Sequence, residues 1–102
     1  MQTKQEAHAV VVVYLDLSLT ETGHAVTREL VTDARKAAER GNIDMACEGI
    51  RRALLALPDW ESGVSTSGCR RLLLLSQDFA TRAQRTAFWA AKRAQRAKDG
   101  AS

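Results

Sequence analysis

The chain of 102 residues suits a single domain over 1–102, and its 45% hydrophobic content excludes disorder along the whole length. The net charge of +3 is unevenly distributed, because residues 1–69 contain seven Lys/Arg and ten Asp/Glu whereas residues 70–102 contain eight and two. Such an asymmetry predicts either an acidic partner for the C-terminal part or a self-complementary assembly.

The two cysteines, Cys47 and Cys69, have no paired spacing, and no stretch resembles a secretory leader or is long enough to span a bilayer. We therefore expect free thiols, a cytoplasmic location and no membrane contact. A bridge between the two cysteines is the alternative.

Residues 9–19 predict a β-strand. The four valines of residues 10–13 are β-branched and favour extended backbone, and leucines then alternate with polar residues. A period of two places one apolar set on a buried face: Ala9, Val11, Val13, Leu15, Leu17 and Leu19. A lone strand cannot satisfy its backbone groups, so its neighbour is expected to be residues 70–75 or the same strand of a second subunit. A helix over residues 3–18 is the alternative, because periodicity does not settle the state of a short apolar run.

Two amphipathic helices are expected next, over about residues 22–40 and 43–57. Gly41 supplies the left-handed conformation that ends the first helix, and Asn42 caps the second. Pro58 stops the second helix. The short link between the two helices predicts an antiparallel hairpin.

The segment of residues 30–58 resembles one tetratricopeptide helix pair. Gly41 and Asn42 lie where that family turns between its helices. Its pattern of small, large and terminating residues is matched by Ala34, Ala46, Ile50, Ala53 and Pro58. The resemblance covers 29 of the 102 residues, without a second repeat, and implies protein binding rather than chemistry.

The predicted order of strand, helix, glycine turn and helix is also similar to a ribbon-helix-helix repressor, a dimer whose paired strands enter the DNA major groove. The segments AAERG and IRRAL resemble the helix hairpin of that family. In this chain the link from Gly41 to Ile50 is longer than in the family. The strand face that would meet DNA carries few basic residues, since it consists of His8, Val10, Val12, Tyr14 and Asp16.

After a polar loop over residues 59–68, a long basic helix is expected from about Ser67 or Cys69 to Ala97, with 98–102 as a disordered tail. If residues 70–75 formed a strand instead, the helix would begin near Gln77. The helical version is favoured, because four consecutive leucines lack the β-branching that strands prefer.

The last helix has two distinct faces. One face, the alanine seam, repeats at steps of three and four residues and permits the close approach of another helix. The alanine seam consists of Ala80, Ala83, Ala87, Ala90, Ala94 and Ala97. The opposite face, the basic stripe, consists of Arg82, Arg85, Trp89, Lys92, Arg93 and Arg96. Such a stripe either tracks phosphates or a protein partner, or is a solvated face that complements the helix dipole.

Helix packing or dimerisation is expected through residues of the alanine seam and of the predicted strand. These are Ala83, Ala87, Ala90, Ala94, Val11, Val13 and Leu15. An exposed patch for a protein partner is expected around Trp60, Phe88 and Trp89.

No catalytic or metal motif is present in the sequence. Cys47 lies on the apolar stripe of the second predicted helix, where burial makes a thiol inert, so it is not expected to act with His24 as a nucleophile. His8, His24, Cys47 and Cys69 lack the paired short spacing of zinc ligands. We therefore predict no enzyme activity, no cofactor and no metal.

Together these features predict a mainly α (α+β) fold with one N-terminal strand, an antiparallel helix hairpin and a long basic C-terminal helix. The predicted function is that of a small non-catalytic protein-binding module, an adaptor or inhibitor of a larger intracellular protein, of the kind that phages and plasmids carry. It is expected to be a homodimer. The alternative is a dimeric transcriptional regulator that binds nucleic acid through the basic helix.

Overall fold

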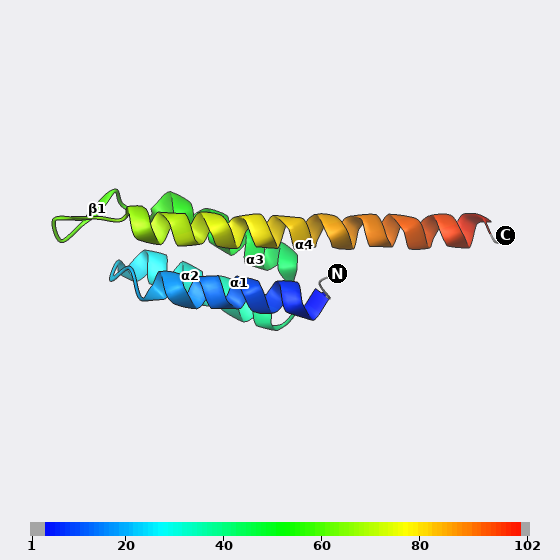
Figure 1. Ribbon diagram of the computed structural model, residues 1–102, viewed down its shortest axis with the longest axis horizontal. Helices are drawn as coiled ribbons and strands as arrows, with labels where there is room; N and C mark the ends of the chain where they lie inside the picture. Colours follow the sequence, from blue (N-terminus) through cyan, green and yellow to red (C-terminus); the bar gives the residue numbers. More distant parts are fainter. Residues whose placement is uncertain (1–3, 101–102) are drawn as a thin grey trace.

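A computed structural model describes residues 4–100, which form four α-helices and one short β-hairpin (Figure 1). In chain order these elements are α1 (Lys4–Leu19), α2 (Ala25–Glu39), α3 (Ile43–Ala56), β1 (Trp60–Glu61), β2 (Val64–Ser65) and α4 (Ser67–Gly100). The predicted mainly α fold class with a minor β part is confirmed.

The four helices form an up-down-up-down bundle. Helix α1 packs against α2 and α4, and α3 packs against the same two helices, so the four close a ring (Figure 1). The molecule measures 63 × 22 × 19 Å. This elongation follows from unequal helix lengths, because α4 has 34 residues whereas α1 has 16 and α3 has 14.

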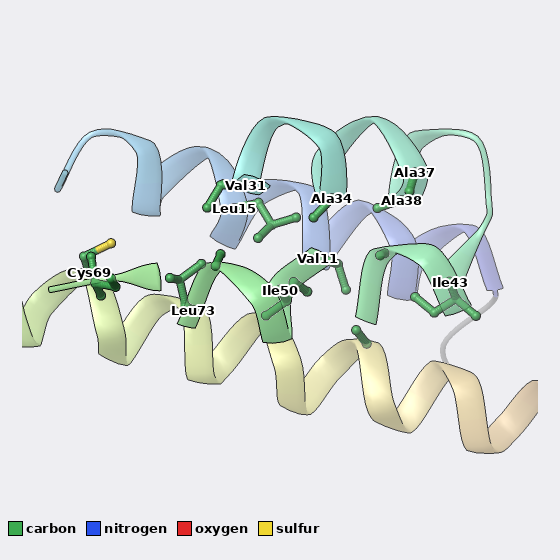
Figure 2. Packing of buried hydrophobic residues seen from close by; sticks show 14 residues of the cluster. Val11, Leu15, Val31, Ala34, Ala37, Ala38, Ile43, Ile50, Cys69 and Leu73 are labelled. Carbon is green, nitrogen blue, oxygen red and sulfur yellow. The ribbon is translucent and has the colours of Figure 1, made fainter. Parts of the chain in front are cut away.

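The core lies along the axis of the bundle, and all four helices contribute to it (Figure 2). Leu15, Ile50 and Leu73 are fully buried, and each contributes about 1.5–3 kcal/mol of transfer free energy. Helix α2 contributes mainly small residues, including Ala34 and Ala37, which let it lie close to its neighbours.

The predicted N-terminal strand is wrong, because residues 4–19 form helix α1. The side chains that α1 buries are spaced at three and four residues: His8, Val11, Leu15 and Ser18. Packing of this inner face between α2 and α4 outweighs the β-propensity of the valines, which is a weak preference that tertiary context overrides. The helical alternative is therefore the one observed, with residue 3 outside the described part of the chain.

The predicted antiparallel hairpin of two helices is confirmed as α2 and α3. Gly41 has a φ of +79°, the left-handed conformation expected of it, and Asn42 caps α3 by accepting a hydrogen bond from the Met45 amide at 3.2 Å. At the other end, His24 caps α2, and its Nδ1 lies 2.8 Å from the Thr27 hydroxyl.

The loop expected over residues 59–68 contains the two-stranded β-hairpin. Ser62 and Gly63 have φ angles of 53° and 79°, and a two-residue hairpin turn with positive φ at both positions matches the twist of its strands. The hairpin is tied to the bundle by Glu61, whose carboxylate accepts hydrogen bonds from the Thr22 hydroxyl at 2.8 Å and the Gly23 amide at 2.6 Å.

Helix α4 includes residues 70–75, as the favoured prediction held, and continues to Gly100. The expected disordered tail over 98–102 is therefore helical through residue 100, while residues 101–102 lie outside the described part. Arg70 at the start of α4 donates hydrogen bonds to the Leu54 and Leu57 carbonyls at 3.5 and 3.2 Å, which satisfies the C-terminal end of α3. None of the helices described is both long and apolar enough to cross a membrane.

Candidate functional site

Helix α4 has an inner half that packs in the bundle and an outer half that leaves it (Figure 1). Leu73, Ser76 and Ala80 are buried, and Gln84 makes the last link by donating a hydrogen bond to the Asp44 carboxylate at 2.8 Å. Every residue from 85 to 100 is exposed. We call these sixteen residues the projecting segment, which extends about 24 Å at 1.5 Å per residue.

The projecting segment keeps its helical form through alanine content and local side-chain contacts. The Lys92 ammonium lies 5.4 Å from the centre of the Phe88 ring, and Gln95 donates a hydrogen bond to Asp99 at 3.4 Å. Lys98 lies in the last turn, where positive charge complements the helix dipole. The segment continues a helix that the bundle already nucleates, so it does not carry the nucleation cost of an isolated helix.

Two neighbouring aromatic residues are the main apolar feature of the projecting segment. The side chains of Phe88 and Trp89 are 55% and 54% exposed, and their rings meet edge to face with centroids 5.5 Å apart. Trp60, which was expected to join them in one patch, lies on the β-hairpin at the opposite end of the bundle (Figure 1). The structure therefore brings together two of the three predicted patch residues.

The six residues of the basic stripe are all exposed: Arg82, Arg85, Trp89, Lys92, Arg93 and Arg96. Arg82 marks the edge of the bundle, since its guanidinium lies 5.9 Å from the centre of the Phe79 ring, which itself stacks on Tyr14 of α1. The projecting segment contains five Lys/Arg and one Asp, a net charge of +4, whereas the other residues contain ten and eleven, a net charge of −1. Positive charge is thus concentrated on a segment whose residues are all exposed in the structure of residues 4–100.

The alanine seam passes from the bundle into the projecting segment. Ala80 is fully buried and Ala83 is half-buried against the core. Ala87, Ala90 and Ala94 continue the same face of the helix but are exposed. The structure thus places one predicted packing residue, Ala83, against the bundle and leaves these three without a neighbour among the described residues.

The predicted packing residues of the N-terminal segment do not share a face, and this corrects the expectation. Val11 and Leu15 are fully buried in the core of the same chain, so they are unavailable to a second subunit, whereas Val13 is 55% exposed. A strand would have placed all three on one side, but successive helical residues are rotated by about 100°. The outward position of Leu17, 45% exposed and one turn after Val13, was missed because only the helical spacing reveals it.

The two cysteines have free thiols of low expected reactivity. Cys69 is buried, and its thiol donates a hydrogen bond to the Ser18 carbonyl at 3.6 Å. Burial raises the pKa of both thiols, with an added contribution from Asp44 for Cys47 and from Glu61 and Glu21 for Cys69. Both thiols are therefore protonated at neutral pH, a poor state for a nucleophile or a metal ligand. Within the described residues, no three His, Cys, Asp or Glu side chains are grouped as a metal site.

Comparison with known proteins gives no relative: no family model, no curated protein and no solved structure matches the chain.

Proposed function

We propose that the chain is a non-catalytic protein-binding module, an adaptor or inhibitor that holds a larger partner with the projecting segment. One observation carries this proposal. Phe88 and Trp89 are more than half exposed on a helix segment whose residues are all exposed in the described part of the chain. Adjacent large aromatic side chains beside arginine are the residue types that dominate binding energy at protein interfaces.

The charge of the projecting segment supports a partner surface of opposite charge. With a net charge of +4 around the aromatic pair, the complementary surface is an apolar groove with acidic residues on its rim. The free thiols of Cys47 and Cys69 fit a protein that acts in the reducing cytoplasm.

A peptide library displayed on phage tests this proposal without a known partner. The full chain is the bait, and a Phe88→Ala/Trp89→Ala variant is used for counter-selection. We expect enriched peptides with apolar and acidic residues whose binding weakens at least tenfold in the variant. Leu55→Ala, at a residue of α3 that is 75% exposed, is the matched control and should leave binding unchanged. Equal binding to the wild type and the double variant would refute the proposal.

The basic stripe favours a second candidate, binding to nucleic acid. Its five Lys/Arg residues, from Arg82 to Arg96, extend over about 21 Å of helix, which suits contacts to successive phosphates. We rank it second because Phe88 and Trp89 pack on each other and Lys92 lies over the Phe88 ring, whereas base stacking needs free aromatic faces.

Fluorescence anisotropy of labelled duplex and single-stranded DNA, titrated across a salt series, distinguishes the two candidates. A log–log salt slope near −4, from about 0.9 for each of up to five charges, would support the nucleic-acid function. An Arg85→Glu/Arg93→Glu variant should then lose that binding. The absence of DNA binding at low salt would leave the basic stripe to a protein partner.

A further inference from the structure

The outer face of α1 has an exposed apolar patch beside the ion pair of Asp16 with Arg35. Val13 and Leu17 are 55% and 45% exposed, and Ala9 is exposed beside them. The surface continues toward α2 as an open groove of about 650 Å³, which is lined by Val12, Val13 and Ala38 and also by Glu39 and Arg40. Exposed apolar patches on a helix are typical of interaction sites.

We infer that this face of α1 is covered by the projecting segment of a second copy of the chain, in a reciprocal two-fold dimer. Over the described residues, α1 and the projecting segment each extend about 24 Å, so the two surfaces are similar in length. The projecting segment leaves the bundle beside the N-terminal end of α1 (Figure 1). Two molecules that meet at these ends each extend this segment along the other's α1.

The alanine seam is the face that makes this contact. Inside the bundle, the same face of α4 is buried through Leu73, Ser76 and Ala80, so the dimer continues an interface that already exists in each chain. The small side chains of Ala90 and Ala94 allow the projecting segment to lie close to the branched side chains of α1.

Charge favours the same pairing. Helix α1 contains Lys4, Glu6 and Asp16, a net charge of −1, whereas the projecting segment has a net charge of +4. Contact between two projecting segments would oppose like charges, but contact between a projecting segment and α1 opposes unlike ones. In the dimer the two helices are parallel, and the basic stripe lies opposite the alanine seam, so the attraction is between the net charges of the two elements rather than between paired side chains.

Two-fold symmetry makes the contact self-limiting. Each chain offers one projecting segment and one α1 face, and the reciprocal arrangement uses both, which closes the assembly at two subunits. A one-way contact would leave both surfaces free at the ends and would build filaments. In the parallel alignment, Ala94 of one chain lies within about one helical turn of the partner's Val13.

Sedimentation velocity of the full chain tests the inference with matched variants. The wild type should sediment at about twice 11.2 kDa. Val13→Glu should give a monomer, whereas Val26→Glu, at a valine of equal exposure on α2 (54% against 55%), should remain a dimer. Ala94→Glu should likewise give a monomer, and Gln95→Glu, which adds the same charge on another face of the helix, should not. Unchanged far-UV circular dichroism ensures that the variants are folded.

Cross-linking then tests the pairing itself. Ala94→Cys and Val13→Cys chains, each with Cys47→Ser, are mixed and oxidised, and the mixed disulfide should exceed both homodimeric products at least tenfold. A monomeric wild type at 100 µM, or a dimer that survives both Val13→Glu and Ala94→Glu, would overturn the inference. Either result would leave the function proposed for Phe88 and Trp89 standing, because those side chains are on other faces of the helix.

Discussion

Helices α2 and α3 pack closely at Gly49, and we predict that Gly49→Ala destabilises the bundle. A Cβ atom at Gly49 would lie 2.8 Å from the Cβ of Ala34 and 3.2 Å from its Cα. Separations below 3.0 Å require a shift of one helix. Ala34 has only 1% of its surface exposed, so it has little room to move.

The magnitude follows from two opposed effects at Gly49. Alanine is favoured over glycine in the interior of a helix by about 1 kcal/mol. Overpacking a filled core costs about 1–3 kcal/mol, because side chains and backbone must move. The expected net change is a loss of about 0–2 kcal/mol, whereas an exposed helical glycine would give a gain of about 1 kcal/mol for the same substitution.

Urea unfolding followed by circular dichroism at 222 nm measures both effects when Gly49→Ala, Ala34→Gly and the double variant are compared. Ala34→Gly removes the Cβ that would clash, so the double variant should be more stable than the sum of the single effects by about 1–2 kcal/mol. The Ala34 Cα remains at 3.2 Å, so the recovery should be incomplete. A Gly49→Ala variant that is more stable by about 1 kcal/mol, with additive effects in the double variant, would refute this account of the contact.

Three further predictions concern the bundle. Leu73→Ala, at a fully buried residue, should lower the free energy of unfolding by about 2–5 kcal/mol, whereas Leu74→Ala, at a residue 49% exposed, should change it by about 0.5 kcal/mol or less in urea titrations. Asn42→Ala removes the cap of α3 and should cost about 1 kcal/mol, and Asn42→Ser should restore most of it. The pKa of Glu48 is lowered, first by its hydrogen bond from Arg51 at 2.6 Å, so its contribution to stability is present above the unfolded pKa of about 4.3 and is lost as pH falls through the lower folded pKa. The Glu48→Gln variant should therefore unfold at a lower temperature than the wild type at pH 7, and the two unfolding temperatures should converge in strong acid. The difference should shrink in high salt because the ion pair is exposed.

The helical hairpin could be predicted from the sequence because local chemistry determines it. Gly41 provides the left-handed turn and Asn42 provides a side-chain cap, and both effects act within a few residues of the chain. The β-hairpin also had a local signal in Ser62 and Gly63, two residues that favour a tight turn. Its strands were too short to be distinguished from a loop by composition.

Helix α1 could not be assigned from the sequence because its state is determined by its neighbours. Val11 and Leu15 are four residues apart. This separation places their side chains on one face in a strand and also in a helix. Val13 distinguishes the two states, because it shares their face in a strand but lies outside in a helix. Its side chain is apolar in either case, so its chemistry gave no sign of its position.

The basic stripe was visible in the sequence, but the projection of α4 was not. The length of α1 decides how much of α4 is covered, including whether Ala87, Ala90 and Ala94 are. That length follows only once α1 is recognised as a helix of 16 residues. Once α1 is helical, the 34 residues of α4 are more than twice the length of either neighbour, the 16-residue α1 or the 14-residue α3. The unpaired half then follows from the lengths of the elements rather than from any motif.

The two interactions inferred for the projecting segment are compatible because they use different faces of one helix. Ala94 and Trp89 are five positions apart, which places them about 140° from one another around the helix axis. A second copy seated on the alanine seam therefore leaves Trp89 free for a partner, and the two-fold dimer presents two such surfaces. Two linked sites hold a multivalent partner more tightly than one site does, without any added contact. A fold that positions a helix beyond its own bundle thus supports both assembly and partner binding with the same sixteen residues.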